Sequence, residues 1–356
     1  DREAEALLGE AAAREARRDW AAAEDLAAQA LSAADRGSGA AGLRKRAEEL
    51  RTTAGEARRR QHLLDRLDHV RLRSGGPPHE AVAGYTGAFA EAGLDFGASP
   101  EEIGRAVAAR DPALREGLIQ ALDDCASRIP PHDERMQETW RRIVQAASAA
   151  DADPWRRRLR TAILKSDQGA VRDMARSVDS EALPPQGFLL LGQALHNVCR
   201  DPDLESRVLA EGGRRHPGDY WIHFTTAHRC LPGRDPLPGG PERAERHARV
   251  AVALRPDNPD ARAILGVALL ARAERSADRD EILQDARRWL QSALETMPAD
   301  GPKQAVRAVL LAAEGRLEEA RLLLRTSDGR PPPPWVRGVP GLAPPDRRGA
   351  PPPDRR

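Results

Sequence analysis

The sequence is poor in aromatic residues, which make up 3% of its 356 residues, although hydrophobic residues of all kinds reach 40%. Any apolar core must therefore come from Ala, Leu and Val. Ala, Leu, Arg and Glu are the strongest helix formers, and the β-branched and aromatic residues that favour strands are scarce. No segment alternates apolar and polar residues as a half-buried strand would. The sequence predicts an all-α protein.

An excess of charge of one sign is also lacking. The chain has 56 basic and 55 acidic side chains, which leaves a formal net charge of +1. A nucleic-acid surface normally needs a basic excess on one face. The basic runs 44–46, 58–60 and 156–158 have acidic residues nearby and are interpreted as solvated helix faces. We therefore expect no nucleic-acid partner.

Cysteines are few: Cys125, Cys199 and Cys230 are far apart and odd in number, so no disulfide framework is implied. They suit a reducing compartment, and a cytoplasmic location is predicted. No apolar run approaches the length of a bilayer-spanning helix and no signal peptide begins the chain, so we expect no membrane association. The first residue is Asp1 rather than Met, which indicates a piece of a longer protein.

Helix breakers divide the chain into four parts. Residues 1–73 are interpreted as a helical hairpin with a long heptad-like helix, and residues 79–182 as a middle region of short helices. Residues 184–328 are expected to form pairs of helices. Residues 329–356, rich in Pro and Arg, have too little to bury and are predicted to be a disordered tail with polyproline II character.

The long helix of the first part carries a weak heptad seam. Its positions are Leu43, Ala47, Leu50, Ala54, Ala57, Gln61 and Leu64. The seam is expected to pack against its own hairpin, while packing against a second chain, and hence self-association, stays open as an alternative.

A repeat in the third part indicates how its helices are arranged. Pro217, Pro256 and Pro298 follow one another at about forty residues, a spacing typical of helical repeats. Alanine, with one leucine, stands at identical offsets before the last two prolines: Ala244, Ala248 and Ala251, then Ala286, Leu290 and Ala293. With the pairs Leu191-Gly192 and Leu265-Gly266, this pattern resembles the tetratricopeptide repeat, whose helix pairs stack into an α-solenoid.

Four further segments extend the resemblance to a particular class of protein. They are 94–102, 119–124, 150–156 and 214–222. With these, the chain from about residue 1 to 328 resembles the region C-terminal to the catalytic domain in planctomycete-type serine/threonine protein kinases with tetratricopeptide repeats. The resemblance implies a kinase domain upstream and a role for this region in recruiting substrates or partners.

The chain itself has none of the kinase motifs Val-Ala-Ile-Lys, His-Arg-Asp or Asp-Phe-Gly, so it is expected to be no enzyme. The predicted function is a non-catalytic protein–protein interaction scaffold. Two alternatives stay open. One is a free-standing structural or oligomerisation module, and the other is an enzyme of unrecognised chemistry.

Three motifs that mimic chemical sites are interpreted as structural. The G-x-G-x-x-G at 37–42 follows a helix rather than a strand, so it is expected to be a turn and no cofactor is predicted. His223, His228 and Cys230 lack the spacing of a zinc site, and no metal is predicted. Cys125 follows two acidic residues, which would raise its thiol pKa rather than activate it.

The predicted binding surface is the inner wall of the superhelix, which the first helix of each pair should line. A protein or peptide partner is expected in this repeat groove. The candidate contact residues are Asp219, Ile222, Thr226, Arg229, Ala263, Val267, Ala305 and Val309. Trp335, in the proline tail, is a further docking candidate, although a plain solvated tail is favoured.

Overall fold

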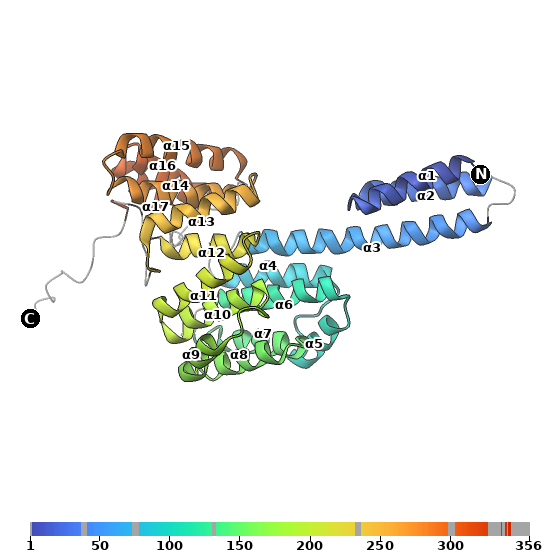
Figure 1. Cartoon of the computed structure of the whole chain (residues 1–356), viewed down its shortest axis with the longest axis horizontal. Helices are drawn as coiled ribbons and strands as arrows, with labels where there is room; N and C mark the ends of the chain where they lie inside the picture. Colours follow the sequence, from blue (N-terminus) through green and yellow to red (C-terminus); the bar gives the residue numbers. More distant parts are fainter. Residues whose placement is uncertain are drawn as a thin grey trace, which may run out of the picture.

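The computed structural model describes residues 2–36, 41–72, 78–129, 133–231, 236–297 and 303–326, together with Val336, Val339, Gly341 and Leu342. These residues form seventeen α-helices and one π-helix and contain no β-strand, which confirms the all-α prediction. Within the same part of the chain, no helix is both long enough and apolar enough to cross a membrane. A helical arm projects from a body of stacked helices (Figure 1).

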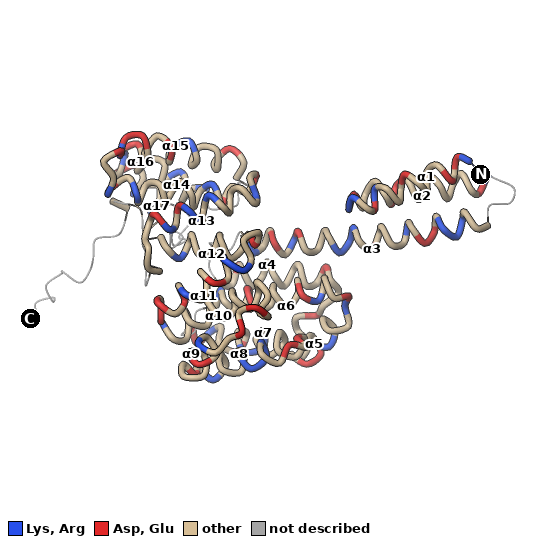
Figure 2. Tube along the Cα trace, in the orientation of Figure 1, with Lys and Arg blue, Asp and Glu red and all other residues tan. Residues whose placement is uncertain are grey.

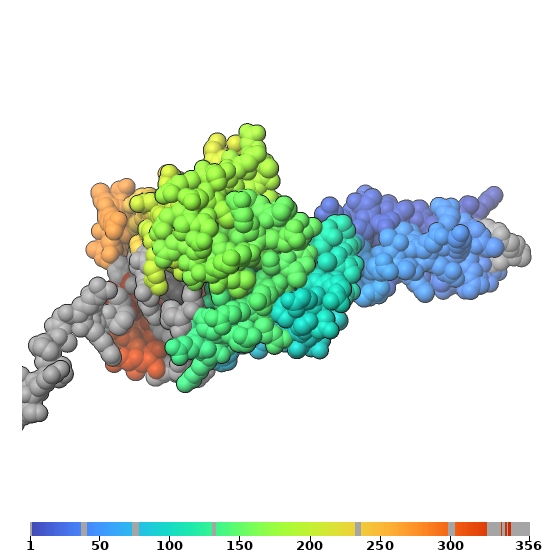
Figure 3. All heavy atoms as spheres, turned by 90° about the horizontal axis from the view of Figure 1, so that it is seen from below, coloured from blue at the N-terminus to red at the C-terminus, as the bar shows by residue number. Residues whose placement is uncertain are grey.

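The arm consists of α1 (Arg2–Ala16), α2 (Trp20–Arg36) and the outer half of α3 (Ala41–Leu72). The first two helices lie along α3 and bury small clusters of Ala and Leu against it (Figures 1 and 3). Leu43 and Leu50 of the predicted heptad seam pack into these clusters. The seam therefore packs against its own hairpin, as expected.

The inner half of α3 belongs to the body. It shares a core with α4 (Pro78–Glu91), α5 (Pro100–Ala108), α6 (Pro112–Ser127) and α7 (Gln137–Ala150). Several of these helices begin as the sequence predicts. Ser99 and Glu102 form a capping box at the start of α5, and the Asp111 carboxylate accepts a hydrogen bond from the Leu114 amide at the start of α6.

A second, continuous core runs through the remaining helices. These are α8 (Pro154–Leu164), α9 (Gln168–Ser177), α10 (Pro185–Ala194), the π-helix η1 (Leu195–Cys199), α11 (Pro202–Arg215), α12 (Tyr220–Cys230), α13 (Gly240–Leu254), α14 (Pro259–Ala273), α15 (Arg279–Thr296), α16 (Lys303–Ala313) and α17 (Leu317–Thr326). Since α8 and α9 bury Leu159, Val171 and Met174 in this core, the cores divide between α7 and α8 rather than near residue 183.

The helices from α12 to α17 stack as successive hairpins, each packing against the next. The repeated small residues lie at the contacts: Ala248, Ala251, Ala286 and Ala293 are at most 1% exposed. A Cβ added to Gly266 of α14 would lie only 2.7 Å from Cγ of Leu290 in α15. Small side chains at these offsets therefore let helices approach closely, as the repeat predicts, and the arrangement is that of an α-solenoid.

Four residues of the predicted disordered tail are described. Val336, Val339 and Leu342 are buried in the second core, and the Arg321 guanidinium donates a hydrogen bond to the Gly341 carbonyl (Nε–O 3.0 Å). The sequence predicted that the tail has too little apolar surface to bury for it to become ordered, whereas these three apolar side chains are buried. Three parts of the sequence predictions lie outside the described residues. They are the rest of the tail with Trp335, the repeat proline Pro298, and residues 37–40 of the glycine motif.

Charges of both signs are interspersed along the chain. Figure 2 shows Lys and Arg interspersed with Asp and Glu along the arm and along the helices of the body. Ion pairs between neighbouring turns are frequent, for example Arg44 with Glu48 (Nε–Oε1 3.2 Å). This pattern is typical of solvated helix faces.

Candidate functional site

The residues predicted to line the repeat groove are mostly buried between helices. Ile222, Thr226, Val267 and Val309 have no exposed surface, and Ala263 is 2% exposed. The first helices α12 and α14 lie between the preceding and the following helices of the array, whereas α16 packs against α14, α15 and α17. A partner cannot reach these side chains in this structure. The prediction of an inner wall formed by them is wrong.

The other three candidates have structural roles or are buried as well. Asp219 caps α12, since its carboxylate accepts a hydrogen bond from the Ile222 amide (Oδ1–N 2.8 Å). Arg229 donates to both carboxylate oxygens of Glu205, at 2.8 Å each. Ala305 is 6% exposed. Of the predicted contact residues, only Asp219 and Arg229 are partly exposed, and both are engaged in these hydrogen bonds.

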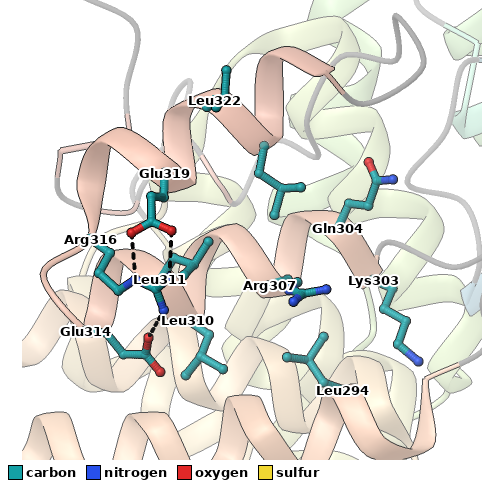
Figure 4. A pocket seen from close by; sticks show the side chains of 11 residues that line it. Leu294, Lys303, Gln304, Arg307, Leu310, Leu311, Glu314, Arg316, Glu319 and Leu322 are labelled. Carbon is teal, nitrogen blue, oxygen red and sulfur yellow. Dashed lines mark hydrogen bonds and ion pairs between the residues drawn. The ribbon is translucent and has the colours of Figure 1, made fainter.

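An open groove lies instead on the last hairpin of the array (Figure 4). It has a volume of about 910 Å³, within the range of pockets that hold ligands. Its lining comes from α15, α16 and α17. The lining residues are Leu294, Lys303, Gln304, Arg307, Leu310, Leu311, Glu314, Arg316, Glu319, Leu322 and Leu323. We call this feature the terminal groove.

Leucines form the apolar surface of the terminal groove. Leu310 and Leu311 of α16 and Leu323 of α17 are half-buried, with part of each side chain packed on the second core. Leu322 is 61% exposed, the most exposed large hydrophobic residue among those described. Leaving this much apolar surface in water is unfavourable by about 25 cal/mol per Å². The groove therefore favours an apolar occupant.

Charged groups at the groove differ in how they are paired. The guanidinium of Arg316 binds the carboxylate of Glu319 (2.6 and 2.8 Å) and also that of Glu314 (3.3 Å), as the dashed lines in Figure 4 show. Lys303 donates to the Met297 carbonyl. Arg307 has no hydrogen bond or ion pair with any residue in the described part of the chain.

The position of the groove follows from the repeat. The register that aligns Ala263 with Ala305 also aligns Leu265, Ala268 and Leu269 of α14 with Arg307, Leu310 and Leu311 of α16. The three α14 residues are at most 1% exposed.

This difference in exposure has a cause in the stacking order. In the described residues α14 packs against α12, α13, α15 and α16, whereas α16 packs against α14, α15 and α17. In the repeat, α16 is the first helix of the hairpin that follows α14. The corresponding neighbour of α16 would be the first helix of a following hairpin, and the described residues contain no such helix. The terminal groove is therefore the open end of the stack.

The two histidines considered as ligands of a metal ion, His223 and His228, do not face each other. His223 of α12 faces His247 of α13, with their Nδ1 atoms 3.0 Å apart, rather than His228. Burial, followed by the charge of Arg229, lowers the pKa of His228 to about 4. In the described residues, no group of three or more His, Cys, Asp or Glu side chains could hold a metal ion.

The three thiols are all buried. Burial, followed by the negative charge of Asp124, raises the pKa of Cys125 well above its usual value. Burial likewise raises the pKa of Cys199, and that of Cys230 to about 11. Because the thiolate is the nucleophilic form, such cysteines are unreactive packing residues near neutral pH.

Sequence reasoning missed the terminal groove, although a signal was present. The third repeat unit stops after Gly315, Ala320 and Leu324 without the proline that follows the first two units. Leu310-Leu311 and Leu322-Leu323 then place leucine pairs on two helices of a hairpin that no later hairpin covers in the described chain. Searches for similar proteins add no assignment, since no family model and no curated protein matches the chain.

Proposed function

We propose that the chain is a non-catalytic protein–protein interaction scaffold and that the terminal groove is its binding surface. The observation that carries the proposal is the groove itself: about 910 Å³ of open, leucine-lined space at the end of a stack of helices. Exposed apolar surface of this kind, bordered by charged residues, is typical of interaction sites. The buried, high-pKa thiols offer no nucleophile that would favour an enzyme.

We further propose that the hairpins from α12 to α17 are tetratricopeptide-like repeats. Their support is the pairwise stacking and the burial of Ala248, Ala251, Ala286 and Ala293 at equivalent positions. In this interpretation the stack grows by adding hairpins at one end. A groove at that end is where a binding partner can add to the stack without rearranging it.

The attachment to a serine/threonine kinase remains a proposal that depends on the sequence resemblance. Two of the segments that carry it have evident structural roles. Asp151 and Arg156 belong to a buried ion-pair network, and Trp221 contacts Arg71. Kinase motifs encoded upstream of Asp1 would support the attachment, and a gene that begins with this region would contradict it.

Oligomerisation through the heptad seam is the less favoured alternative. Ala47, Ala54 and Ala57 of the seam are at most 3% exposed within a single chain. A second chain could use the seam only after displacing α1 and α2.

The scaffold function can be tested by selecting peptides against the groove. A displayed library of helical peptides would be panned on the full chain, with Leu322→Glu as the counter-target. Enrichment of peptides with an apolar i, i+3, i+4 pattern that fail to bind Leu322→Glu is the expected result. Leu254→Glu, which changes a leucine 38% exposed on α13, is the matched control. Peptides that bind all three proteins equally would contradict the proposal.

A further inference from the structure

The terminal groove also contains information about what binds it. Figure 4 shows Arg307 among the labelled groove side chains, between Leu311 on one side and Lys303 and Gln304 on the other. The remaining arginine of the groove, Arg316, is already neutralised by Glu319 and Glu314. Lys303 donates a hydrogen bond to a main-chain carbonyl. Arg307 is thus the basic residue of the groove that has neither a hydrogen bond nor an ion pair within the described chain.

The shape of the groove indicates a helix. Within the array, each first helix of a hairpin lies against both helices of the preceding hairpin: α14 contacts α12 and α13, and α16 contacts α14 and α15. The terminal groove presents the same two kinds of surface on α16 and α17. An incoming helix would therefore continue an interface that the chain already repeats.

The charge of the groove indicates the chemistry of that helix. The α14 residue in the register of Arg307 is Leu265, which is 1% exposed beneath its neighbours. A helix in the equivalent place would cover Arg307 and remove water from its guanidinium. A covered guanidinium without an acceptor is costly, so a carboxylate on the incoming helix is needed.

We propose that the occupant of the terminal groove is an amphipathic helix of a partner protein, with an apolar i, i+3, i+4, i+7 stripe and an acidic residue facing Arg307. This inference rests on the proposed scaffold function and makes it specific. The leucines supply the affinity, and Arg307 discriminates between acidic and basic helices.

The test uses two designed helical peptides of about fifteen residues, a length that helix formation in water requires. Both peptides carry the same leucine stripe. They differ at one position next to that stripe, which is Glu in one peptide and Lys in the other. Binding to the full chain is followed by fluorescence anisotropy. The Glu peptide is expected to bind about threefold to tenfold more tightly than the Lys peptide, as a partly covered ion pair allows.

Two variants separate this inference from the function on which it rests. Arg307→Glu should reverse the preference between the peptides, while Arg325→Glu, the same change on an exposed α17 residue outside the groove lining, should leave it unchanged. Equal binding of both peptides, unaffected by Arg307→Glu but lost in Leu322→Glu, overturns the charge recognition and leaves the scaffold function standing. Binding of both peptides unaffected by Leu322→Glu overturns the scaffold function itself.

A second copy of the chain is the competing occupant. Light scattering during size-exclusion chromatography measures it directly. A monomer is expected for the wild-type chain and for Leu322→Glu. A wild-type dimer that Leu322→Glu converts to monomer would show that the groove holds another copy, and would overturn the proposal of a partner helix.

Discussion

The guanidinium carbon of Arg71 lies 3.8 Å from the ring centroid of Trp221, so the last turn of α3 stacks on the first turn of α12. The same guanidinium donates to the Asp124 carboxylate of α6 (Nε–Oδ1 3.2 Å). Arg255, after α13, adds an ion pair to Asp68 of α3 (Nη2–Oδ2 2.8 Å). The helix that carries the arm is thus held by side chains from both cores.

We expect Arg71 and Trp221 to be coupled energetically. In a double-mutant cycle of Arg71→Met and Trp221→Leu, the coupling free energy should be about 1–2 kcal/mol, because the cation–π contact is buried. The measurement is urea unfolding followed by circular dichroism. Arg66→Met, which removes a surface ion pair to Glu91, is the control and should cost at most about 1 kcal/mol. Additive losses for the first pair would contradict the coupling.

Arg160 lies at the centre of a buried network of ion pairs between α6, α7 and α8, and replacing it tests how much this network stabilises the fold. It has no exposed surface and binds Asp123 (Nη2–Oδ2 2.6 Å) and Asp151 (Nη1–Oδ2 2.8 Å). Arg160→Met leaves Asp123 without this partner and should lower the free energy of unfolding by about 3–5 kcal/mol.

The matched control is Arg157→Met, which changes an exposed arginine one turn earlier on α8. It should change the free energy of unfolding by less than about 0.5 kcal/mol. Both variants are measured by urea unfolding at neutral pH. A loss for Arg160→Met as small as that of the control would show that the network contributes little.

Much of the fold could be predicted from local signals. The capping box at Ser99 and the aspartate cap at Asp111 depend only on neighbouring residues, and the structure places helix starts there. The recurring alanines and glycines also predicted where helices approach closely, because only small residues allow such contacts. These signals need no knowledge of distant parts of the chain.

The candidate site depended on information that is not local. The helical period shows that Ile222 and Val267 lie on one face, but not whether another helix covers that face. In the structure both are fully buried, because the adjacent hairpins enclose their helices. The open surface appears where the stack ends, so finding it requires knowing which neighbour is absent from α16.

The repeat packing can be tested at Gly266. A Cβ at this position would lie 2.7 Å from Leu290 Cγ and 3.2 Å from the Ala286 carbonyl oxygen, which cannot move without shifting α15. Gly266→Ala should therefore destabilise the chain by about 1–3 kcal/mol.

Gly9→Ala makes the same substitution in α1, where nothing lies within 4 Å of the added Cβ. It should stabilise the chain by about 0.5–1 kcal/mol, because alanine is the better helix former. Thermal unfolding by calorimetry compares the two. A stabilising effect at both glycines would mean that α14 and α15 are not in close contact.

The pair of imidazoles between α12 and α13 predicts a dependence of stability on pH. His223 Nε2 lies 3.1 Å from the Pro217 carbonyl, which can only accept, so Nε2 carries the proton. The Nδ1 of neutral His223 is then the acceptor, and His247 donates to it across 3.0 Å. A second proton on His223 would place two N–H groups face to face.

The pKa shifts of the pair agree with this arrangement. Burial, opposed by the hydrogen bond to Pro217, lowers the pKa of His223, while burial and the neighbouring His223 lower that of His247 to about 4. An unfolded histidine has a pKa of about 6.5. Between pH 4 and pH 6.5 the unfolded chain therefore binds more protons than the folded chain. The free energy of unfolding is highest above pH 6.5 and decreases as the pH falls toward 4.

We therefore expect the free energy of unfolding of the wild-type chain to fall by about 1 kcal/mol more between pH 7 and pH 5 than that of His247→Leu. Urea unfolding at a series of pH values between 5 and 7 gives the free energy of unfolding of each protein. Subtracting the variant's values from those of the wild type removes the contribution of the titratable groups that both proteins share. His62→Leu, at an exposed histidine of α3, should give a profile parallel to the wild type. If the His247→Leu profile is parallel too, the two imidazoles take up protons in the folded chain as readily as in the unfolded one, and the pair does not oppose protonation.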